Sequence, residues 1–401
     1  METNRNSFKS VSSNECNPKW NKMIERNEEI YTSSTDIRSP FERDFNRILC
    51  SNAYNRLKHK TQVFFSPEDD HICTRIGHVN YVESVSYTIA NYLGLNTELT
   101  RAIAFGHDVG HAPFGHRGEK ILSEISTKDI GKSFWHEKNG LYLVDNIELL
   151  EDYDGYKRNL NLTYAVRDGI ISHCGEVDET SLKPREEAIN LNTYEYPNQY
   201  APYTWEGCIV KVADKISYLG VDIEDAIKEG FLDDEKIKEL NDILGRKDKI
   251  SNALIMNRLI TDICKHSSPE KGITLSVESL ELMNKIKEYN YKNIYVSSRM
   301  KPSENYFKLV INQIYSILKD CFDEKNTINN LKKIEKYYPM LSKRFLNWLH
   351  DYSNLGNRDK LKNKIVFDIN NEKEYYSAII SYIAGMTDKY AIDLYNEIIH
   401  F

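Results

Sequence analysis

Apolar residues recur at intervals of three and four positions along most of this 401-residue chain. Between residues 75 and 95 the recurring positions are Ile76, Val79, Val82, Val85, Ile89 and Leu93. This spacing is typical of a helix that buries one face. The same pattern occurs in GLYLVDNIELL, LTYAVRDGIISH, EGCIVKVADKISYLGVDIEDAI, KISNALIMNRLITDIC, ENYFKLVINQIYSIL and YYSAIISYIAGMTDKYAIDLYNEII, whereas strand-like alternation is scarce. The sequence therefore predicts an all-α fold.

The same patterning predicts how the chain is organised. Residues 1–35 are polar and weakly patterned, and we expect a flexible N-terminal arm there. Residues 36–230 form the expected core, in which Thr97 has the context of a helix N-cap and a proline-rich loop runs from residue 175 to about 203. A soft division is expected near Gly230, followed by a helical C-terminal region over 231–401 without a dense cluster of reactive side chains.

The composition argues against several classes of protein. No run approaches the roughly 18 apolar residues of a membrane span, and the polar N-terminus lacks the apolar middle of a signal peptide, so we expect a cytoplasmic protein. Seven scattered cysteines without a CxxC pair indicate reduced thiols. A net charge of −7 argues against a general nucleic-acid binder, but it is compatible with a local basic pocket for a phosphate-bearing ligand.

Reactive side chains are densest in AFGHDVGHAPFGHRGE, residues 104–119. His107 and Asp108, with glycines on both sides, can direct an imidazole nitrogen and a carboxylate oxygen toward one point at a helix end. A divalent ion that acts on a phosphate needs three or four such ligands. His78 on the preceding helix and Asp214 in the apolar segment KVADKISYL are two more candidates. Because a lone His beside an Asp is more often an N-cap or a surface pair, the hypothesis of a metal site depends on all four residues.

At this point the motifs resemble a known family. RIGH, GHD and VADK, in that order, resemble the H…HD…D signature of the HD-domain metal-dependent phosphohydrolases. The segments RSPFERDFNRILCSNAYNRLKHKTQVF, TRIGHVNYVESV, GHDVGHAPFGHRGE, FWHEKNG, LNLTYAVRDGIISH and YTWEGCIVKVADKISYLGVDIEDA are similar to the deoxynucleoside triphosphate triphosphohydrolases of dGTPase type. The resemblance covers about residues 38–230 and implies a helical HD-domain catalytic core. Beyond it the chain matches only in being helical, and in this family such regions contribute to oligomer contacts and regulation.

The resemblance implies a role for each reactive residue. The implied metal ligands are His78, His107, Asp108 and Asp214. Such a mixed imidazole and carboxylate set accepts Mn²⁺ or Mg²⁺, and also Fe²⁺ or Zn²⁺. His116 matches the family's catalytic histidine and Glu119 its acidic partner, three residues apart on one helical face. His111 matches a further active-site histidine, with a helix-cap role as the alternative, and His136 matches one that meets the phosphates.

Substrate contacts are implied in the same way. Arg75, one helical turn before the first ligand, matches a phosphate-contacting arginine, and Lys215, next to the last ligand, matches a phosphate-contacting lysine. Tyr218 and Asp222 match the pair that reads the sugar 3′-hydroxyl, and Gln62 matches another sugar contact. Helical spacing aligns Tyr218 and Asp222 with the last ligand. The alternatives are core packing for Tyr218 and a solvated charge for Asp222.

The implied reaction is metal-dependent hydrolysis of a deoxynucleoside triphosphate to the deoxynucleoside and inorganic triphosphate. A nucleotide activator and a homo-oligomer are also implied. From the composition and charge we expect no membrane and no nucleic acid as main partner. Two alternatives stay open. One is another HD phosphohydrolase, such as an alarmone hydrolase or a cyclic-dinucleotide phosphodiesterase, although the GYP motif expected of the latter is absent from the sequence. The other is a catalytically silent nucleotide-sensing protein, which would normally have lost one of the ligands.

Overall fold

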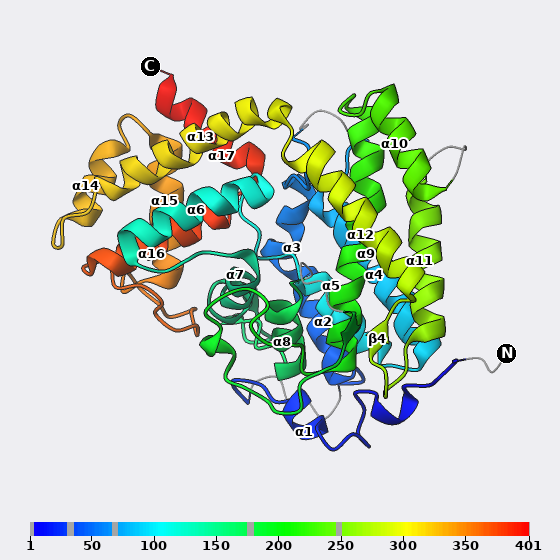
Figure 1. Cartoon of the computed structure of the whole chain (residues 1–401). Helices are drawn as coiled ribbons and strands as arrows, with labels where there is room; N and C mark the ends of the chain where they lie inside the picture. The colour runs from blue at the N-terminus through cyan, green and yellow to red at the C-terminus, as the bar shows by residue number, and fades with distance from the viewer. Residues whose placement is uncertain (1–3, 30–35, 66–70, 175–179, 246–250, 401) are drawn as a thin grey trace. The chain divides into compact units, whose positions relative to one another are not determined.

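A computed structural model describes residues 4–29, 36–65, 71–174, 180–245 and 251–400. These residues are mainly helical, with two short pairs of antiparallel strands, so the all-α prediction is confirmed (Figure 1). The chain divides into two compact units, and each consists of three separate segments. Unit 1 comprises Met1–Leu49, Glu68–Asp108 and Leu162–Met300, and unit 2 comprises Cys50–Pro67, Val109–Asn161 and Lys301–Phe401.

Unit 1 is built around helices from all three of its segments. Its helices are α1 (Trp20–Met23), α2 (Pro40–Cys50, whose last residue falls in unit 2), α4 (Arg75–Leu93), α5 (Thr97–Gly106), α8 (Tyr164–Ser172), α9 (Trp205–Lys228), α10 (Asp234–Leu244), α11 (Asn252–His266) and α12 (Val277–Asn290). Short 3₁₀ turns lie at Lys9–Val11, Leu191–Thr193 and Ser298–Met300, and a π-helical turn at Tyr291–Tyr295. Strand β3 (Ser181–Leu182) pairs antiparallel with β4 (Ile273–Thr274).

Helix α9 is the centre of unit 1. It packs against α4, α5, α8, α11 and α12, and Figure 1 shows α9 beside α4 and α12. Its N-terminus is capped by Thr204, whose hydroxyl accepts a hydrogen bond from Gly207 N at 3.1 Å. The apolar face predicted for α4 is buried at Val79, Val82, Val85, Ile89 and Leu93, while Ile76 is half-buried. The helical period therefore identified the contact face of α4 correctly.

The cap of α5 differs from the prediction by one residue. Thr97 was expected to be the N-cap, but Thr97 is the first residue of the helix and Asn96 caps it. Asn96 Oδ1 accepts hydrogen bonds from Glu98 N and Leu99 N, both at 3.0 Å. Asparagine and threonine are both good capping residues, so adjacent candidates are separated only by their backbone geometry.

Residues 4–29 are packed onto unit 1 and do not form the expected flexible arm. Phe8 is fully buried, and its ring meets the ring of Trp205 edge-on, with centroids 4.9 Å apart. Ser13 donates from its backbone N and its hydroxyl to the buried carboxylate of Glu206, at 3.0 and 2.6 Å. These contacts are isolated and long-range, so they leave no periodic signal in the sequence. Residues 1–3 and 30–35 of the expected arm lie outside the described residues.

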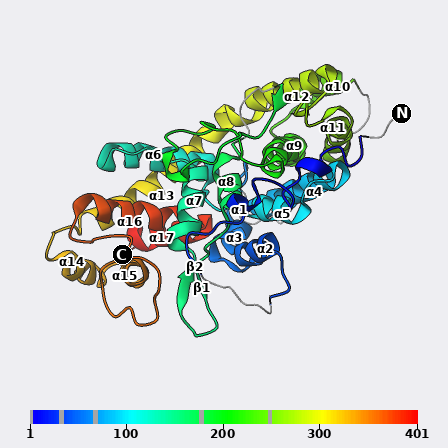
Figure 2. The same cartoon turned by 90° about the horizontal axis from the view of Figure 1, so that it is seen from below.

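Unit 2 is also mainly helical. Its helices are α3 (Asn52–Arg56), α6 (Gly115–Ile130), α7 (His136–Tyr142), α13 (Lys301–Lys319), α14 (Thr327–Ile334), α15 (Pro339–Tyr352), α16 (Glu372–Ala384) and α17 (Asp388–Ile399). A 3₁₀ turn lies at Leu57–His59 and a π-helical turn at Leu143–Ile147. Strands β1 (Leu149–Glu151) and β2 (Lys157–Asn159) form an antiparallel pair, which Figure 2 shows as a hairpin.

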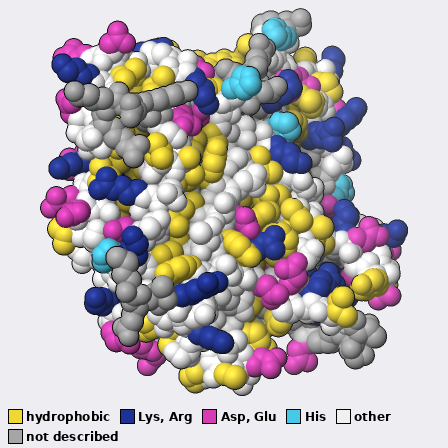
Figure 3. All heavy atoms as spheres, turned by 90° about the vertical axis from the view of Figure 1, so that its right-hand side faces the viewer, with side chains coloured by type: hydrophobic (Ala, Val, Ile, Leu, Met, Phe, Trp, Pro, Cys, Tyr) yellow, Lys and Arg dark blue, Asp and Glu magenta, His cyan; other side chains and the backbone are white. Residues whose placement is uncertain are grey.

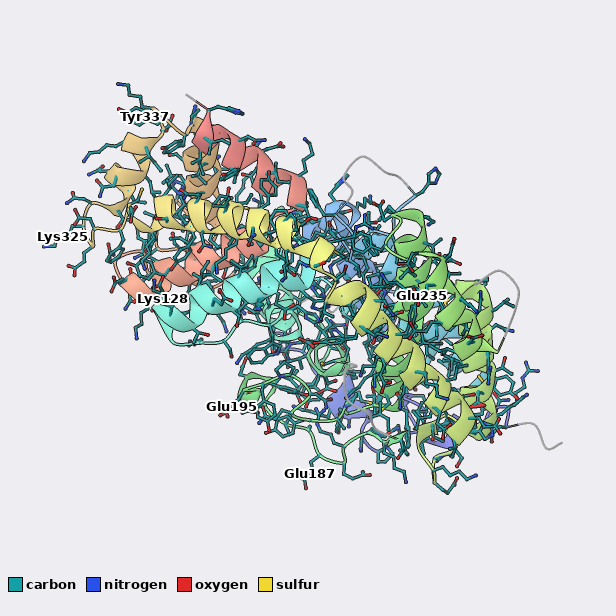
Figure 4. The ribbon with its side chains drawn as sticks, turned by 45° about the horizontal axis from the view of Figure 1, so that its top comes forward. Lys128, Glu187, Glu195, Glu235, Lys325 and Tyr337 are labelled. Atoms are coloured by element: carbon teal, nitrogen blue, oxygen red, sulfur yellow. The ribbon has the colours of Figure 1, made fainter. Side chains whose placement is uncertain are left out.

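Helices from distant parts of the sequence share the core of unit 2. Helix α6 packs against α13 and α16, and α13 packs against α16 and α17. Leu122 of α6, Ile314 of α13 and Ile383 of α16 are fully buried in this core. Charged side chains lie on the outside, such as Lys128 of α6 and Lys325 just before α14 (Figure 4). The helices of unit 2 are thus amphipathic, as their sequence period predicted.

The expected division near Gly230 does not coincide with a boundary between the units. Helix α9 ends close to Gly230, which has a φ of +63°, but α10, α11 and α12 follow within unit 1. Helices α11 and α12 pack directly on α9. A composition shift along the chain cannot show that a later segment folds back onto an earlier one. Of the expected proline-rich loop, residues 175–179 lie outside the described residues.

The surface is mixed in character. Figure 3 shows one face on which Lys, Arg, Asp and Glu side chains are interspersed with apolar ones. Within the part of the chain that the structure describes, none of the helices is both long and apolar enough to cross a membrane.

Candidate functional site

Three elements of unit 1 bring the predicted metal ligands together. His78 lies in the first turn of α4, His107 and Asp108 form the turn directly after α5, and Asp214 lies in the middle of α9. Because α4 packs against both α5 and α9, these side chains converge. A ring nitrogen of His78, a ring nitrogen of His107 and a carboxylate oxygen of Asp214 all lie within 4.8 Å of one another.

The distances within this cluster leave room for a cation at its centre. His78 Nε2 lies 2.9 Å from Asp214 Oδ1. His107 Nε2 lies 3.8 Å from Asp108 Oδ1 and 3.9 Å from Asp214 Oδ1, and both distances are too long for hydrogen bonds. The imidazole of His107 therefore faces two carboxylates without bonding to either.

The tautomer of His107 shows that these residues fit a divalent cation. Its Nδ1 lies 2.6 Å from the carbonyl oxygen of Ala104, which can only accept, so Nδ1 bears the ring proton and Nε2 has a free lone pair. Nε2 is buried and has no hydrogen-bond partner among the described residues. A buried lone pair that faces carboxylate oxygens is satisfied when a cation lies between them.

The electrostatics of the cluster agree with this interpretation. Burial alone would lower the pKa of His78, but the hydrogen bond to Asp214 and the charges of Asp214 and Asp108 outweigh it and raise that pKa. Burial lowers the pKa of His107, which keeps its imidazole neutral. Burial would raise the pKa of Asp214, yet the hydrogen bond and the charge of His78 hold it below its usual range. Neutral His107 and ionised Asp214 are the protonation states that bind metals.

Arg75 is buried beside the cluster. Its side chain is 1% exposed, and its Nη1 donates to Asp108 Oδ2 at 2.9 Å. Its Nε and Nη2 are buried and have no hydrogen-bond partner among the described residues. The structure thus uses the Nη1 nitrogen of Arg75 to orient Asp108 and leaves the nitrogens Nε and Nη2 for a further acceptor.

A second cluster lies in unit 2, around the carboxylate of Glu119. His116 and Glu119 lie near the start of α6, His136 begins α7, and His111 lies just before α6. The Nδ1 atoms of His136, His116 and His111 lie 3.1, 3.4 and 3.8 Å from Glu119 Oε2. The rings of His111 and His136 stack with centroids 3.8 Å apart. The structure therefore brings all four residues together, and one carboxylate contacts three imidazoles.

Glu119 and His116 have complementary environments. Burial would raise the pKa of Glu119, but the charge of His136 and hydrogen bonds from His116 and His136 hold it well below its usual range. The His116 side chain is 65% exposed, whereas that of His111 is 2% exposed. An ionised Glu119 can therefore orient the one imidazole of this cluster that is open to solvent.

Sequence reasoning missed two residues that support the clusters. In unit 1, the ring of His173 lies 5.0 Å from that of His107. In unit 2, Asn139 Nδ2 donates to the carbonyl oxygen of Gly110 at 2.7 Å. A Cβ atom at Gly110 would lie 2.0 Å from the carbonyl oxygen of His136, so only glycine fits. His173 lies in the motif LNLTYAVRDGIISH and Asn139 in the motif FWHEKNG. Their position in these family-like motifs was the sequence signal that could have identified them.

The structure places the residues predicted to contact the sugar and the phosphates in different surroundings. Tyr218 and Asp222 lie one and two turns after the last ligand on α9. Asp222 is buried and accepts a hydrogen bond from the hydroxyl of Tyr295 at 2.5 Å. Lys215 lies on another face of α9 and lines a pocket with residues of α11, α12 and β4. Gln62 is half-buried in unit 2, and its Oε1 has no hydrogen-bond partner among the described residues.

Asp222 gives the fold a pH-dependent stability. Burial raises the pKa of Asp222 from 3.8 to about 7. Its proton is then held more tightly in the folded state, so this contribution to stability is present below about pH 4 and is lost as the pH rises through about 7. We expect the unfolding free energy of the wild type to fall over this range more steeply than that of Asp222→Asn, by up to about 1.4 kcal/mol per pH unit. Urea titrations of both proteins at several pH values measure the difference, and parallel pH profiles would contradict it.

Comparisons with known proteins place the chain in a family. The HD domain family matches residues 75–219, and the phosphohydrolase-associated domain family matches residues 340–397. The chain is 34% identical over 364 residues to a deoxyguanosinetriphosphate triphosphohydrolase-like protein of Caldanaerobacter subterraneus subsp. tengcongensis, which covers 90% of this chain and 86% of that protein. It is 32% identical over 379 residues to a protein of the same name from Rickettsia bellii, with 91% and 92% covered.

The HD match includes His78, His107, Asp108 and Asp214, because all four lie within residues 75–219. The similarity to the relatives extends beyond this match over most of the chain. With the helical fold, these findings show that the chain belongs to the HD-domain family of deoxyguanosinetriphosphate triphosphohydrolase-like proteins.

Proposed function

We propose that this protein hydrolyses deoxynucleoside triphosphates to the deoxynucleoside and inorganic triphosphate, and that the reaction depends on a divalent cation. The observation behind this proposal is the buried His107 Nε2, which faces Asp108 and Asp214 and has no hydrogen-bond partner among the described residues. The names of the similar proteins support the choice of substrate class.

In this proposal the first cluster holds the cation. The ligands would be His78, His107, Asp108 and Asp214. When bound, Mn²⁺ or Mg²⁺, or alternatively Fe²⁺ or Zn²⁺, supplies Lewis-acid polarisation of a phosphate and activation of water. Arg75 fixes the orientation of Asp108 and would donate its remaining N–H groups to phosphate oxygens. Lys215 would add a second positive charge toward the triphosphate.

The second cluster would act on the leaving group. His116 would donate a proton to the 5′-oxygen as its bond to phosphorus breaks, or position that oxygen. Because Glu119 Oε2 contacts His116 Nδ1, the other ring nitrogen, Nε2, is the one that can reach the substrate. His136 would contact the phosphates, and His111 would be a further catalytic histidine beside His116. An exposed imidazole backed by an ionised carboxylate is the arrangement that general acid catalysis requires.

Tyr218 and Asp222 would enclose the sugar, with Gln62 as a further contact. Asp222 Oδ2 accepts the hydroxyl of Tyr295, so Oδ1 would accept the sugar 3′-hydroxyl. A buried polar group that is built for one hydroxyl loses about 1–3 kcal/mol when that hydroxyl is missing. The expected selectivity therefore depends on Asp222 and not on the metal ligands.

We expect deoxynucleotides to be cleaved, ribonucleotides to be poor substrates, and 2′,3′-dideoxynucleotides to have a kcat/KM at least about tenfold lower. Steady-state rates for dGTP, GTP and 2′,3′-dideoxy-GTP measure this preference. In Asp222→Asn the penalty for the dideoxy analogue should shrink, because the amide binds the hydroxyl less strongly. Tyr218→Phe is a second test, since a tyrosine that only packs in the core would leave the preference unchanged. Equal efficiency on all three nucleotides would reject the sugar site even if the metal site is correct.

The proposed reaction is tested directly by its products. The purified protein is incubated with each deoxynucleoside triphosphate and Mn²⁺ or Mg²⁺, and the products are separated by ion-exchange chromatography. Deoxynucleoside with triphosphate supports the proposal. Monophosphate with pyrophosphate would indicate another HD phosphohydrolase reaction, and intact nucleotide under all conditions would indicate a nucleotide-sensing protein.

The proposal includes a homo-oligomer and a nucleotide activator, which the family resemblance implies. Light scattering after size-exclusion chromatography measures the subunit number. Rates with one deoxynucleotide, measured with and without a second one, show whether activation occurs.

A further inference from the structure

The turn that precedes α6 has an unusual backbone. Phe114 has a φ of +65° and Gly115 a φ of +60°. The left-handed region is unfavourable for a residue with a Cβ atom, so Phe114 adopts it only when its surroundings enforce it. Phe114 is also the N-cap residue of α6, and its side chain provides no capping hydrogen bond. The turn between His111 and His116 therefore depends on contacts from elsewhere in unit 2.

Asp388, the first residue of α17, provides one of these contacts. It is 5% exposed. Its Oδ1 accepts a hydrogen bond from Phe114 N and its Oδ2 accepts one from Thr61 N, both at 2.8 Å. Hydrogen bonds to a buried carboxylate are stronger than those between neutral groups. Asp388 therefore fixes the backbone at the strained end of the turn.

Lys60 fixes the other end of the turn. It is 2% exposed, and its Nζ donates to the carbonyl oxygens of His111 and of Ala384, the latter at 3.0 Å. Ala384 ends α16 and Asp388 begins α17, so both ends of the turn are tied to one short connection between these helices. Figure 1 shows α16 beside α6, and the two helices are in contact.

A third contact holds the side chain of Phe114. Its ring stacks on the ring of Phe307 from α13, with centroids 4.2 Å apart and an interplanar angle of 4°. Ala384 and Asp388 both lie within residues 340–397, the segment that matches the phosphohydrolase-associated domain. This segment thus contacts the histidine turn directly through Asp388, and through the carbonyl oxygen of Ala384 it holds the Lys60 side chain that bonds to His111.

We propose that Asp388 and Lys60 are positioning residues, which hold His111 and His116 in their working arrangement around Glu119. This inference rests on the proposed function. It gives the phosphohydrolase-associated segment a task in catalysis, namely to supply the carboxylate and the carbonyl oxygen that shape the histidine turn. A purely structural role would instead lower the stability of unit 2 without changing turnover by the folded protein.

The first test is Asp388→Asn. The amide keeps one acceptor oxygen but sets an NH₂ group against a backbone N–H, so one of the two hydrogen bonds is lost. We expect kcat to fall by about 10- to 100-fold, because a small displacement of a catalytic group has an effect of this size. KM and bound metal should stay within about twofold of wild type, since neither depends on the turn.

The matched control is Glu397→Gln on the same helix. The carboxylate of Glu397 also accepts two backbone N–H groups, from Met340 at 2.7 Å and from Leu341 at 2.9 Å, but these belong to the start of α15. Replacing this carboxylate should lower the midpoint of urea unfolding about as much as Asp388→Asn does. The kcat of Glu397→Gln should stay within about twofold of wild type. If both variants lose kcat equally, or neither does, the positioning role is overturned.

A second variant, Lys60→Met, tests the same role in case Asp388→Asn does not fold. Methionine preserves the buried apolar stem of the lysine and removes only its charge. Lys60→Met should also lower kcat. In the double variant with Asp388→Asn, the fold-loss of kcat should be smaller than the product of the two single fold-losses, because both residues act on one turn. Fully independent effects would count against a shared role.

Hydrogen exchange tests the inference without any substrate. Amides of residues 111–116 should exchange faster in Asp388→Asn than in wild type and should be unaffected in Glu397→Gln. If the wild type cleaves no deoxynucleotide, the proposed function fails, and exchange alone decides whether Asp388 holds the turn. Unchanged exchange at residues 111–116 in Asp388→Asn would overturn the inference.

Discussion

Replacing Asp214 with asparagine is expected to lower kcat/KM for deoxynucleotide hydrolysis by about 10³-fold or more and to abolish stable metal binding. Asp214 Oδ1 lies 2.9 Å from His78 Nε2 and 3.9 Å from His107 Nε2, so it faces both imidazoles of the cluster. An amide of the same shape has no negative charge to balance a divalent cation. Metal content after dialysis, measured by mass spectrometry, and steady-state rates in Mn²⁺ and Mg²⁺ test both parts of this prediction.

Asp262→Asn is the control for this substitution. Asp262 is another carboxylate of unit 1, and it accepts hydrogen bonds from the backbone N and the hydroxyl of Ser276 at 2.6 and 2.9 Å. Its replacement should lower stability but leave metal content and rate close to wild type. An Asp214→Asn protein that retains its metal would reject the ligand assignment. One that loses the metal but keeps its rate would show that the cation is not required.

Replacing His116 with alanine is expected to reduce kcat by about 10²- to 10⁴-fold, the usual contribution of general acid–base catalysis. Metal and deoxynucleotide binding should persist, because His116 is 65% exposed and lies outside the ligand cluster of unit 1. Loss of a side chain this exposed should also change stability little. The measurements are single-turnover rates at saturating enzyme and binding of a nonhydrolysable deoxynucleotide analogue.

His59→Ala separates a specific effect from the general loss of an imidazole. His59 is an exposed histidine of unit 2, and we assign it no role at either cluster. Its replacement should leave kcat and binding as in wild type. Near-normal turnover by His116→Ala would remove His116 from the mechanism, and loss of nucleotide binding in that variant would give it a binding role instead.

Local patterns predicted the features that depend on a few neighbouring residues. The period of three and four identified Val79, Val82 and Val85 as the buried face of α4, because helical geometry repeats along one element. The i, i+3 spacing of His116 and Glu119 predicted their shared face, and their side chains lie 3.4 Å apart. Cap positions are less certain from sequence, and Asn96 rather than Thr97 caps α5.

Pairings between distant segments could not be predicted in this way. Arg75 donates to Asp108, Asp222 accepts the hydroxyl of Tyr295, and Phe8 packs against Trp205, yet no repeat or spacing connects these positions. Burial then changes the chemistry of the groups involved. The pKa of Asp222 rises to about 7 because it is withdrawn from water, which depends on every helix packed around it.

The sequence by itself therefore determined the helical class, the buried faces of single helices and the residue types of both clusters, since each of these follows from local periodicity or side-chain chemistry. Only the tertiary structure decided which separate segments of the chain make up each unit and how residues 4–29 pack. It also decided that Asp388 and Lys60 form hydrogen bonds with the histidine turn. The physical reason is that such contacts join positions far apart in the sequence, from 51 residues for Lys60 and His111 to 274 for Phe114 and Asp388. They form only when burial brings complementary groups together and leaves no water to satisfy them.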